Sequence, residues 1–271
     1  MSATSFHILP SGLRMAYRHT AGTGPTIVFL PGYMSDMAGG KACAVFDWAQ
    51  REGRACLLLD YSGCGESEGS FADGSLSQWR DEVLALIDAK VAGPVVLVGS
   101  SMGGWLMLLG ALALGPRVAG LVGIAAAPDF TTWGYDEAQK ATLAKGETVL
   151  EPNPYGPEPT PTYAKFWADG QANLMLEGEI AIPAPVRLLH GMDDADVPPA
   201  IGHRLGHHAQ MGAIGQRPLL LVGATGGKPR QLLLTPRAIV AHFRHAPALA
   251  RGIQHPLERG LMGVRRLERK K

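Results

Sequence analysis

Short, continuous apolar runs alternate along this chain with longer stretches in which apolar residues recur at helical spacing. Such runs are typical of strands that are buried on both faces of a sheet. They predict strands at 6–9, 13–20, 26–32, 55–63, 95–100, 118–127 and 186–191, with a weaker one at 217–223. The helical spacing predicts helices at 37–52, 76–90, 102–114, parts of 135–146 and 161–176, and 199–210. This order predicts an α/β fold in which helices flank both faces of a mostly parallel sheet.

Residues 128–183 interrupt this alternation. Five prolines fall within EPNPYGPEPTP (151–161), and that density predicts neither regular helix nor regular strand there. Large apolar side chains surround the prolines: Phe130, Trp133, Tyr135, Tyr155, Tyr163, Phe166, Trp167 and Met175. They indicate either a small local core or a cap whose aromatic residues line a pocket for an apolar group.

The composition fits one large domain, residues 1–271, with a cap insertion at about 128–183. Hydrophobic residues make up 46% of the chain, enough for a sizeable core. The formal net charge of +1 gives no overall field that would attract nucleic acid. No apolar run reaches the roughly 18–20 residues that span a bilayer. We therefore expect neither a nucleic-acid partner nor a membrane span, and the sequence leaves the oligomeric state open.

The cysteines and the first residues bear on cofactors and location. Cys43, Cys56 and Cys64 form an odd, scattered set without the spacing of metal ligands, so neither a metal nor another cofactor is expected. They indicate reduced thiols. Residues 1–12 lack the basic, apolar or arginine-rich patterns of a targeting peptide. Together these features predict a cytoplasmic location.

The stretch 95–114 carries the strongest chemical signal. An apolar strand leads into GSSMG (99–103), and an apolar helix follows. This is the layout of a nucleophile elbow, a sharp strand-to-helix turn that exposes its middle residue. The flanking glycines avoid clashes with the turn and the returning helix, and the helix start directs free N–H groups at the serine. Ser101 is therefore the candidate nucleophile for attack on an acyl carbon.

Two further strand ends supply candidate partners for Ser101. An oxyanion hole needs an N–H from the residue after the nucleophile, here Met102, and another from a loop after an earlier strand. The Tyr33 N–H, just past the strand at 26–32, is that second candidate. A carboxylate that orients a histidine is expected in the loop after the strand at 186–191, and Asp194 is our choice there.

The other acidic and thiol groups near these strand ends receive structural interpretations. Asp193 and Asp196 are expected to cap the loop or to be exposed. The segment DYSGCGESEG (60–69) is expected to support the site, with Cys64 as a buried neighbour. No histidine nearby in the sequence would activate that thiol.

These motifs together make the chain resemble the α/β-hydrolases. More narrowly, it is similar to the branch that contains the mitochondrial palmitoyl-protein thioesterase and acyl-glucuronide esterase, with its bacterial relatives. The resemblance covers about residues 5–198 and rests on LPGYMSDMAGGKA (30–42), DYSGCGESEG (60–69), QWRDEVLALID (78–88), GSSMGGWLMLL (99–109), GLVGIAAAPDFT (120–131) and PVRLLHGMDDADVP (185–198).

The resemblance implies a serine hydrolase that acts on a small-molecule carboxyl ester or acyl thioester. It assigns Ser101 as nucleophile, Asp194 as the acid of the triad, and the Tyr33 and Met102 N–H groups as oxyanion donors. The third member, a histidine, is unknown. In the family it follows the acid by about thirty residues, which leads here to Ala224, and no histidine lies between His208 and His242.

Composition changes near the same point. Residues 199–271 contain no Asp and carry a formal charge of +11, against −10 for residues 1–198. One interpretation is a basic segment that binds an anionic partner. We prefer a change of reading frame near Pro198 or Pro199. Six histidines fall in this segment. The candidates for the missing triad histidine are the earlier His190 and, within the segment, His203, His207, His208, His242 and His245. His190 is expected to be structural.

Three functions therefore stand open at this point. The first is a serine hydrolase of esters or thioesters. The second is a catalytically impaired protein of the same fold that binds an apolar acyl group, which the absent histidine favours. The third is an interaction protein that uses the basic segment 199–271.

Overall fold

The strands form one sheet whose order differs from their order in the chain. The computed structural model describes residues 3–153, 156–182, 184–212 and 219–223. Within them, the order is β1-β2-β4-β3-β5-β6-β9-β10. β2 pairs antiparallel with both β1 and β4, and the other pairs are parallel. The strands are β1 (Ser5–Ile8), β2 (Arg14–Thr20), β3 (Thr23–Leu30), β4 (Arg54–Leu59), β5 (Val95–Ser100), β6 (Val118–Ile124), β9 (Val186–Gly191) and β10 (Leu219–Gly223).

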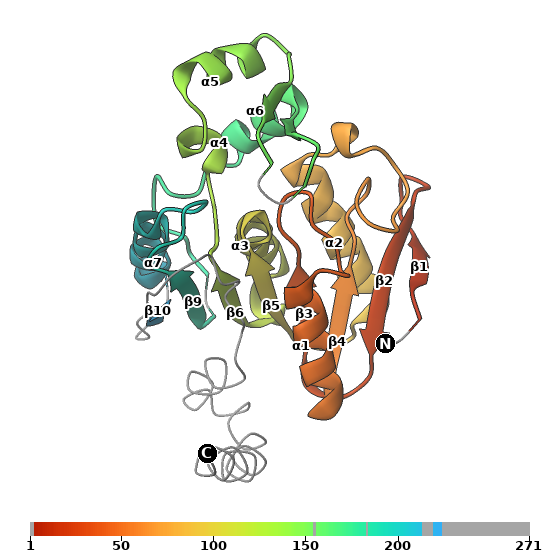
Figure 1. Cartoon of the computed structure of the whole chain (residues 1–271). Helices are drawn as coiled ribbons and strands as arrows, with labels where there is room; N and C mark the ends of the chain where they lie inside the picture. The colour runs from red at the N-terminus through yellow and green to blue at the C-terminus, as the bar shows by residue number, and fades with distance from the viewer. Residues whose placement is uncertain (1–2, 154–155, 183, 213–218, 224–271) are drawn as a thin grey trace, which may run out of the picture. The chain divides into compact units, whose positions relative to one another are not determined.

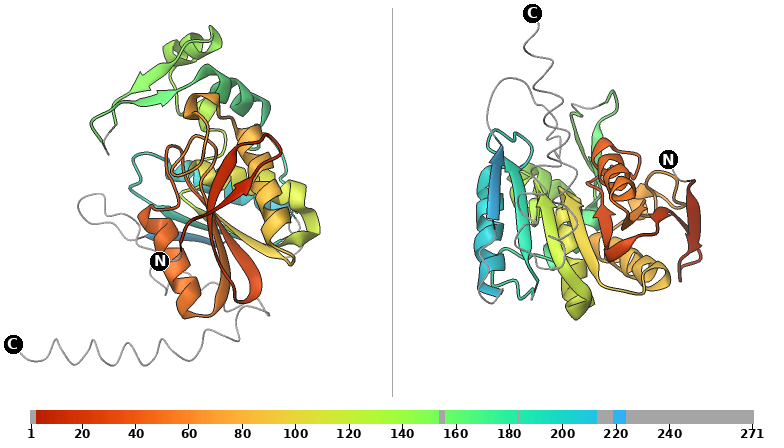
Figure 2. Two further views of the ribbon diagram at one scale, coloured as in Figure 1. Left: turned by 90° about the vertical axis from the view of Figure 1, so that its right-hand side faces the viewer. Right: turned by 90° about the horizontal axis from the view of Figure 1, so that it is seen from below.

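Helices cover both faces of this sheet. α1 (Gly40–Arg51) packs on β4, whereas α3 (Met102–Leu114) packs on β5 and β6 with α2 (Leu76–Lys90) beside it. In Figure 2, α1 lies across the sheet from α2 and α3. α7 (Pro199–Gly212) packs on β9 and β10. The expected α/β architecture, a mostly parallel sheet flanked by helices, is confirmed. The expectation of a single domain extends to residues 224–271, which lie outside the described residues, and it stays a prediction.

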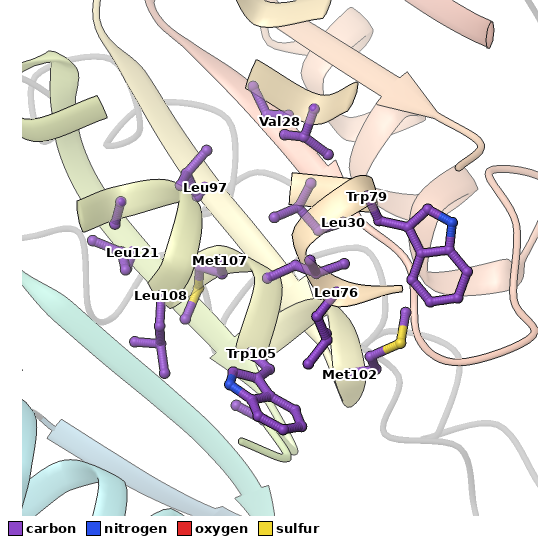
Figure 3. Packing of buried hydrophobic residues seen from close by; sticks show 14 of the residues in the cluster. Val28, Leu30, Leu76, Trp79, Leu97, Met102, Trp105, Met107, Leu108 and Leu121 are labelled. Atoms are coloured by element: carbon purple, nitrogen blue, oxygen red, sulfur yellow. The ribbon is translucent and has the colours of Figure 1, made fainter. Parts of the chain in front are cut away.

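The main core is built around α3. Its sequence, MGGWLMLLGALAL, is apolar on every side, which is the pattern of a helix that is itself buried. Trp105, Met107 and Leu108 lie between the side chains of strands β3, β5 and β6 and those of α2 (Figure 3). The elbow is therefore set on a helix that has little freedom to shift.

Residues 128–183 lie between β6 and β9, and we call them the cap segment. In Figure 1 its helices lie beyond the carboxyl ends of the parallel strands. It contains α4 (Phe130–Trp133), α5 (Glu137–Ala144), β7 (Val149–Glu151), β8 (Thr160–Thr162) and α6 (Ala164–Ala172). Two short 3₁₀ turns, η1 (Phe71–Asp73) and η2 (Gly115–Arg117), complete the described elements.

The cap segment corrects one prediction. The proline-rich stretch 151–161 was expected to hold no regular strand, yet β7 and β8 pair antiparallel at its two ends, with Pro161 opposite Leu150. That prediction was wrong because proline is tolerated on an edge strand, where its missing N–H removes no bond from a further neighbour. In this two-stranded ribbon both strands are edges.

The aromatic residues of the cap segment divide between two clusters. Tyr135, Leu143 and Val149 form a small core of their own, against which Trp167 packs. Phe166 is 1% exposed and belongs to the main core, and Phe130, Trp133 and Met175 pack against it. The interpretation of a local core is confirmed for Tyr135 and Trp167, whereas Phe166, Trp133 and Met175 join the main core and Phe130 contacts both clusters. The pocket interpretation stays a prediction, and Tyr155 lies outside the described residues.

One buried carboxylate ties the two ends of the cap segment together. Asp129, at the segment's start, accepts the N–H of Met175 at 2.8 Å and that of Leu176 at 2.7 Å. These partners lie 46 and 47 positions further along the chain. Asp129 is 5% exposed, and its burial raises its pKa above the ordinary value. The Asp129 side chain therefore links the start of the cap segment to residues 175 and 176 near its end.

Candidate active site

The chain turns sharply at Ser101, between β5 and α3. Ser101 has φ +53° and ψ −121°, in a region that non-glycine residues seldom adopt. Its N–H donates to the Ile124 carbonyl at 3.0 Å, and its own carbonyl accepts the N–H groups of Gly104 and Ala127. The backbone is thus held on both sides, and the serine is partly exposed rather than buried. This is the strained turn that the sequence predicts.

Close backbone packing explains the glycines around Ser101. A side chain on Gly99 would overlap the Gly103 carbonyl, and one on Gly103 would overlap the carbonyl oxygens of Leu30 and Pro31. A side chain on Gly104 would overlap Ala126. The turn therefore requires glycine at these positions for space, and α3 lies directly against the ends of β3 and β6.

The two candidate oxyanion amides lie at neighbouring strand ends. Met102 is the first residue of α3, where a helix leaves its N–H groups without an intrahelical acceptor. Tyr33 follows β3, which pairs with β5. The loop between β3 and α1, residues 31–39, therefore lies next to the elbow, and we call it the Tyr33 loop. Between them, Gly32 faces the serine: a Cβ built on Gly32 would lie 3.4 Å from the Ser101 Cβ. Among the described residues, neither amide has a hydrogen-bond acceptor.

Asp60 fixes the far end of the Tyr33 loop. One of its oxygens accepts the Met37 N–H at 2.7 Å, and the other accepts the Glu66 N–H at 2.9 Å. Asp60 is buried, and this burial raises the pKa of its carboxyl group. The segment 60–69 therefore supports the site, as expected. Sequence reasoning did not single out Asp60 itself, although an aspartate ending a buried strand before a glycine-rich loop is a usable signal.

Cys64 lies in the same segment and is not suited to act as a nucleophile. It is 7% exposed, and burial raises the pKa of its thiol to about 12. The reactive form of cysteine is the thiolate, which this environment disfavours. The expectation of a buried neighbour is confirmed.

Asp194 lies in the loop after β9 and before α7. Its Oδ1 accepts the N–H groups of Asp196 at 3.0 Å and Val197 at 2.9 Å, which leaves Oδ2 for another donor. Asp194 is partly buried, whereas Asp193 and Asp196 are exposed. Two backbone hydrogen bonds therefore fix the orientation of the Asp194 carboxylate.

Ser101 and Asp194 lie at the same edge of the sheet. Both follow the carboxyl ends of parallel strands, and β6 separates β5 from β9. Strands spaced by about 4.8 Å put β5 and β9 about 10 Å apart. A side chain such as an imidazole could bridge the two residues, which do not hydrogen-bond directly.

The described histidines do not supply that bridge. His190 is buried, and its Nε2 is 2.8 Å from the Val197 carbonyl, so the expectation of a structural role is confirmed. His203 and His207 are exposed on α7, and His208 is partly buried there. Within the described residues, no histidine hydrogen-bonds to Asp194. His242 and His245 lie outside those residues, and the third triad member stays unknown.

The described residues were also compared with what a membrane span and a metal site require, and the geometry fits neither. No helix among them is both long and apolar enough to cross a membrane. Nor do three or more His, Cys, Asp or Glu residues gather there in a way that could hold a metal ion.

Comparison with known proteins gives close relatives. The rat palmitoyl-protein thioesterase ABHD10, mitochondrial (Rattus norvegicus), is 41% identical over 195 residues, 70% of this chain and 64% of that protein. The human protein of the same name is 38% identical over 202 residues, 73% of this chain and 66% of that protein. The chain thus spans just under two thirds of the length of these relatives. They confirm the expected branch.

A solved structure agrees with these relatives. Alpha/beta hydrolase domain-containing protein 10 from mouse has a TM-score of 0.74 and 34% sequence identity with this chain. The match covers 83% of this chain and 90% of the mouse structure. The likeness therefore extends over most of both chains.

The relatives also correct the expected location. Their names place those proteins in mitochondria, so the prediction of a cytoplasmic location is wrong. Free cysteines are common to the cytosol and other reducing compartments, so they could not identify one of them.

The sequence profile of the alpha/beta hydrolase family matches residues 27–257. This range includes the Tyr33 loop, the elbow at Ser101 and the Asp194 loop. Profile, relatives and fold agree, and the chain belongs to the alpha/beta hydrolase family.

Proposed function

We propose that this protein is a serine hydrolase that cleaves acyl thioesters or carboxyl esters through Ser101. The strained backbone at that serine is the observation that carries the proposal, because it presents a hydroxyl at the strand ends that also hold the Met102 and Tyr33 amides, for which the described part of the chain shows no acceptor. Folded chains hold a non-glycine residue in such a conformation only when the surrounding structure enforces it. Here three backbone hydrogen bonds do so.

In the proposed reaction the Ser101 Oγ attacks the acyl carbon, and a histidine takes the serine proton. The Asp194 Oδ2 accepts the other ring N–H of that histidine and stabilises its charged form. The N–H groups of Tyr33 and Met102 stabilise the oxyanion of the tetrahedral intermediate. The histidine returns its proton to the leaving thiol or alcohol, and water then hydrolyses the acyl-enzyme. Loss of one oxyanion donor typically lowers the rate by roughly 10²–10³.

The relatives favour a thioester over other acyl substrates. The rat and human proteins are named palmitoyl-protein thioesterases, and this chain shares 41% and 38% of its aligned residues with them. We therefore propose an apolar acyl thioester as the substrate class.

Labelling with a fluorophosphonate probe tests the proposal, because the probe reacts with activated serines. The wild-type chain should be labelled and should hydrolyse acyl thioesters, and Ser101→Ala should abolish both. Ser70→Ala is the matched control, because Ser70 is an exposed hydroxyl outside the elbow and outside the Tyr33 loop. Equal labelling of wild type and Ser101→Ala would refute the assignment of the nucleophile.

The second candidate is a catalytically impaired protein that binds an apolar acyl group. The absence of a described histidine bonded to Asp194 favours it. Without that base the serine hydroxyl stays protonated, and turnover falls to the level that binding and the oxyanion hole provide alone. An unlabelled wild-type chain that still binds acyl thioesters would support this alternative.

A further inference from the structure

Tyr33 is the point at which the proposed oxyanion loop meets the cap segment. Its backbone belongs to the loop whose Gly32 faces Ser101. Its side chain leaves that loop and enters the cap segment, where the hydroxyl donates to the Pro161 carbonyl at 2.9 Å. These two residues are 128 positions apart in the chain. One residue thus carries a candidate catalytic amide on its backbone and a cap contact on its side chain.

The ring of Tyr33 is held on several sides. Its centroid lies 5.0 Å from that of Phe71, 5.9 Å from that of Phe130 and 4.9 Å from that of Phe166. Phe130 and Phe166 belong to α4 and α6 of the cap segment. Edge-to-face and tilted contacts of this kind restrict the ring to one orientation. The hydroxyl is therefore aimed at β8 by packing as well as by its hydrogen bond.

The hydroxyl is a permanent donor. Burial raises the pKa of Tyr33 above its ordinary value, so the group stays protonated at working pH. A buried hydroxyl that loses its partner destabilises the folded state, which favours keeping this contact. The acceptor is the carbonyl of Pro161 in β8, which pairs with Leu150 of β7. The acceptor therefore belongs to a paired strand.

The Tyr33 loop has another anchor at its far end, where the Met37 N–H is bound by Asp60. Between these points lies Met34, at φ +53°. An amide that stabilises an oxyanion must be held to within about 0.5 Å of its working position. Asp60 fixes the loop four residues beyond the amide, whereas the Tyr33 side chain fixes the residue that carries it.

We propose that the Tyr33 hydroxyl is a positioning group, through which the cap segment holds the Tyr33 amide in the oxyanion hole. The inference rests on the proposed hydrolase function and deepens it. The cap segment then contributes to the chemical step as well as covering the site. Tyr33 acts on the reacting atoms only through its backbone, and its side chain touches no substrate.

Tyr33→Phe tests the proposal because it removes the hydroxyl and keeps the ring. Ser77→Ala is the matched control: the Ser77 hydroxyl accepts the Asn173 side-chain N–H at 3.1 Å, a contact between α2 and the cap segment that involves no residue of the Tyr33 loop. The substrate is p-nitrophenyl butyrate, a short activated ester. With full-length protein, kcat, KM and melting temperature are measured for wild type and both variants.

We expect Tyr33→Phe to lower kcat about tenfold with KM within twofold of wild type, because a displaced amide weakens transition-state stabilisation. Ser77→Ala should keep kcat within twofold, even where its melting temperature falls by a similar amount. Equal kcat values for the two variants, or a loss confined to KM or to melting temperature, would overturn the inference.

Fluorophosphonate labelling separates this failure from failure of the proposed function. A wild-type chain that is labelled at Ser101, with Tyr33→Phe equal to it in kcat, overturns only the role of the hydroxyl. A wild-type chain that is neither labelled nor active overturns the proposed function and this inference together.

Discussion

Gly32 lies against Ser101 so closely that a Cβ on the glycine would be 3.4 Å from the Cβ of the serine and 3.4 Å from the Ser100 carbonyl oxygen. A methyl group there is tolerated by the backbone but occupies the space next to the proposed nucleophile. Gly32→Ala should therefore fold and lose at least tenfold in kcat/KM, because the acyl carbonyl must lie in that space. Gly40→Ala is the control, since a Cβ there meets nothing within 4 Å. Equal ester hydrolysis by the two variants would show that Gly32 does not border the reacting group.

Substitution of Gly103 is expected to lower the stability of the fold. A side chain there would overlap the carbonyl oxygens of Leu30 and Pro31, which belong to a packed backbone that cannot move away. Gly103→Ala should lower the free energy of unfolding by about 1–3 kcal/mol or more. In the same helix, a Cβ on Gly110 would meet only Leu97, at 3.8 Å. Gly110→Ala should be neutral or stabilising by up to about 1 kcal/mol. Urea denaturation of both variants checks the contrast.

Asp194 predicts a loss of activity without a loss of fold. Asp194→Asn keeps Oδ1 as acceptor for the loop N–H groups but removes the charge that would stabilise an imidazolium. We expect kcat to fall by roughly 10²–10⁴ with little change in melting temperature. Asp193→Asn, at an exposed neighbour, should retain activity. Similar kinetics for the two variants would exclude Asp194 as the acid.

Leu205 tests whether residues 199–212 fold as the structure describes. Its side chain is completely buried on α7 and joins the main core. Leu205→Ala should cost about 2–5 kcal/mol of unfolding free energy. His203→Ala, at an exposed position of the same helix, should stay within about 0.5 kcal/mol of wild type. A neutral Leu205→Ala would indicate that α7 does not pack on the sheet.

The same helix bears on the reading-frame hypothesis. α7 supplies Ile201, Leu205 and Ala209 to the core, and β10 extends the sheet in parallel with β9. These features favour a change of frame, if there is one, after Gly223 rather than near Pro198. The change of frame would be either an error in the sequence or a real mutation. Resequencing the gene distinguishes them, because one continuous frame through residue 271 would rule out the error.

The buried carboxyl group of Asp129 should make the free energy of unfolding depend on pH, in a direction that its raised pKa determines. Burial raises its folded-state pKa above the ordinary value of 3.8, despite the nearby positive charge of Arg204, which acts in the opposite direction. The folded state then binds the proton more tightly than the unfolded state, so this group's contribution to stability grows as pH falls through the folded pKa towards 3.8. Below that value the contribution is constant.

The comparison that isolates this term is wild type against Asp129→Asn, measured as unfolding free energy from pH 7 to pH 3. The wild type should gain relative to the variant as pH falls. A gain on raising pH instead would mean that the folded-state pKa is depressed, contrary to the burial of this carboxylate.

Sequence patterns predicted the elements whose signals are local. The helices expected at 76–90 and 102–114 have those same bounds in the structure. In the first, the Ser75 side chain accepts the Gln78 N–H and marks the start of the helix. In the second, the glycine-flanked elbow marks it. The positions of Ser101, Tyr33 and Asp194 at one edge of the sheet followed from the rule that parallel strands share a carboxyl end.

The rest depends on contacts between distant segments. No local pattern shows that Tyr33 meets Pro161, or that the ends of the proline-rich stretch pair as strands. Asp129 gave no signal either, because its partners are backbone groups more than 40 positions away. The histidine stayed unknown for a different reason: its usual position leads to Ala224, outside the described residues.

The link from Asp129 to Met175 and Leu176 also has a consequence for how such enzymes can diversify. Because these hydrogen bonds hold the two ends of the stretch 129–176 together, lengthening that stretch adds little to the entropy cost of closing it. Substrate specificity can then change by replacement of the residues between them, provided that the new segment also offers an acceptor to the Tyr33 hydroxyl.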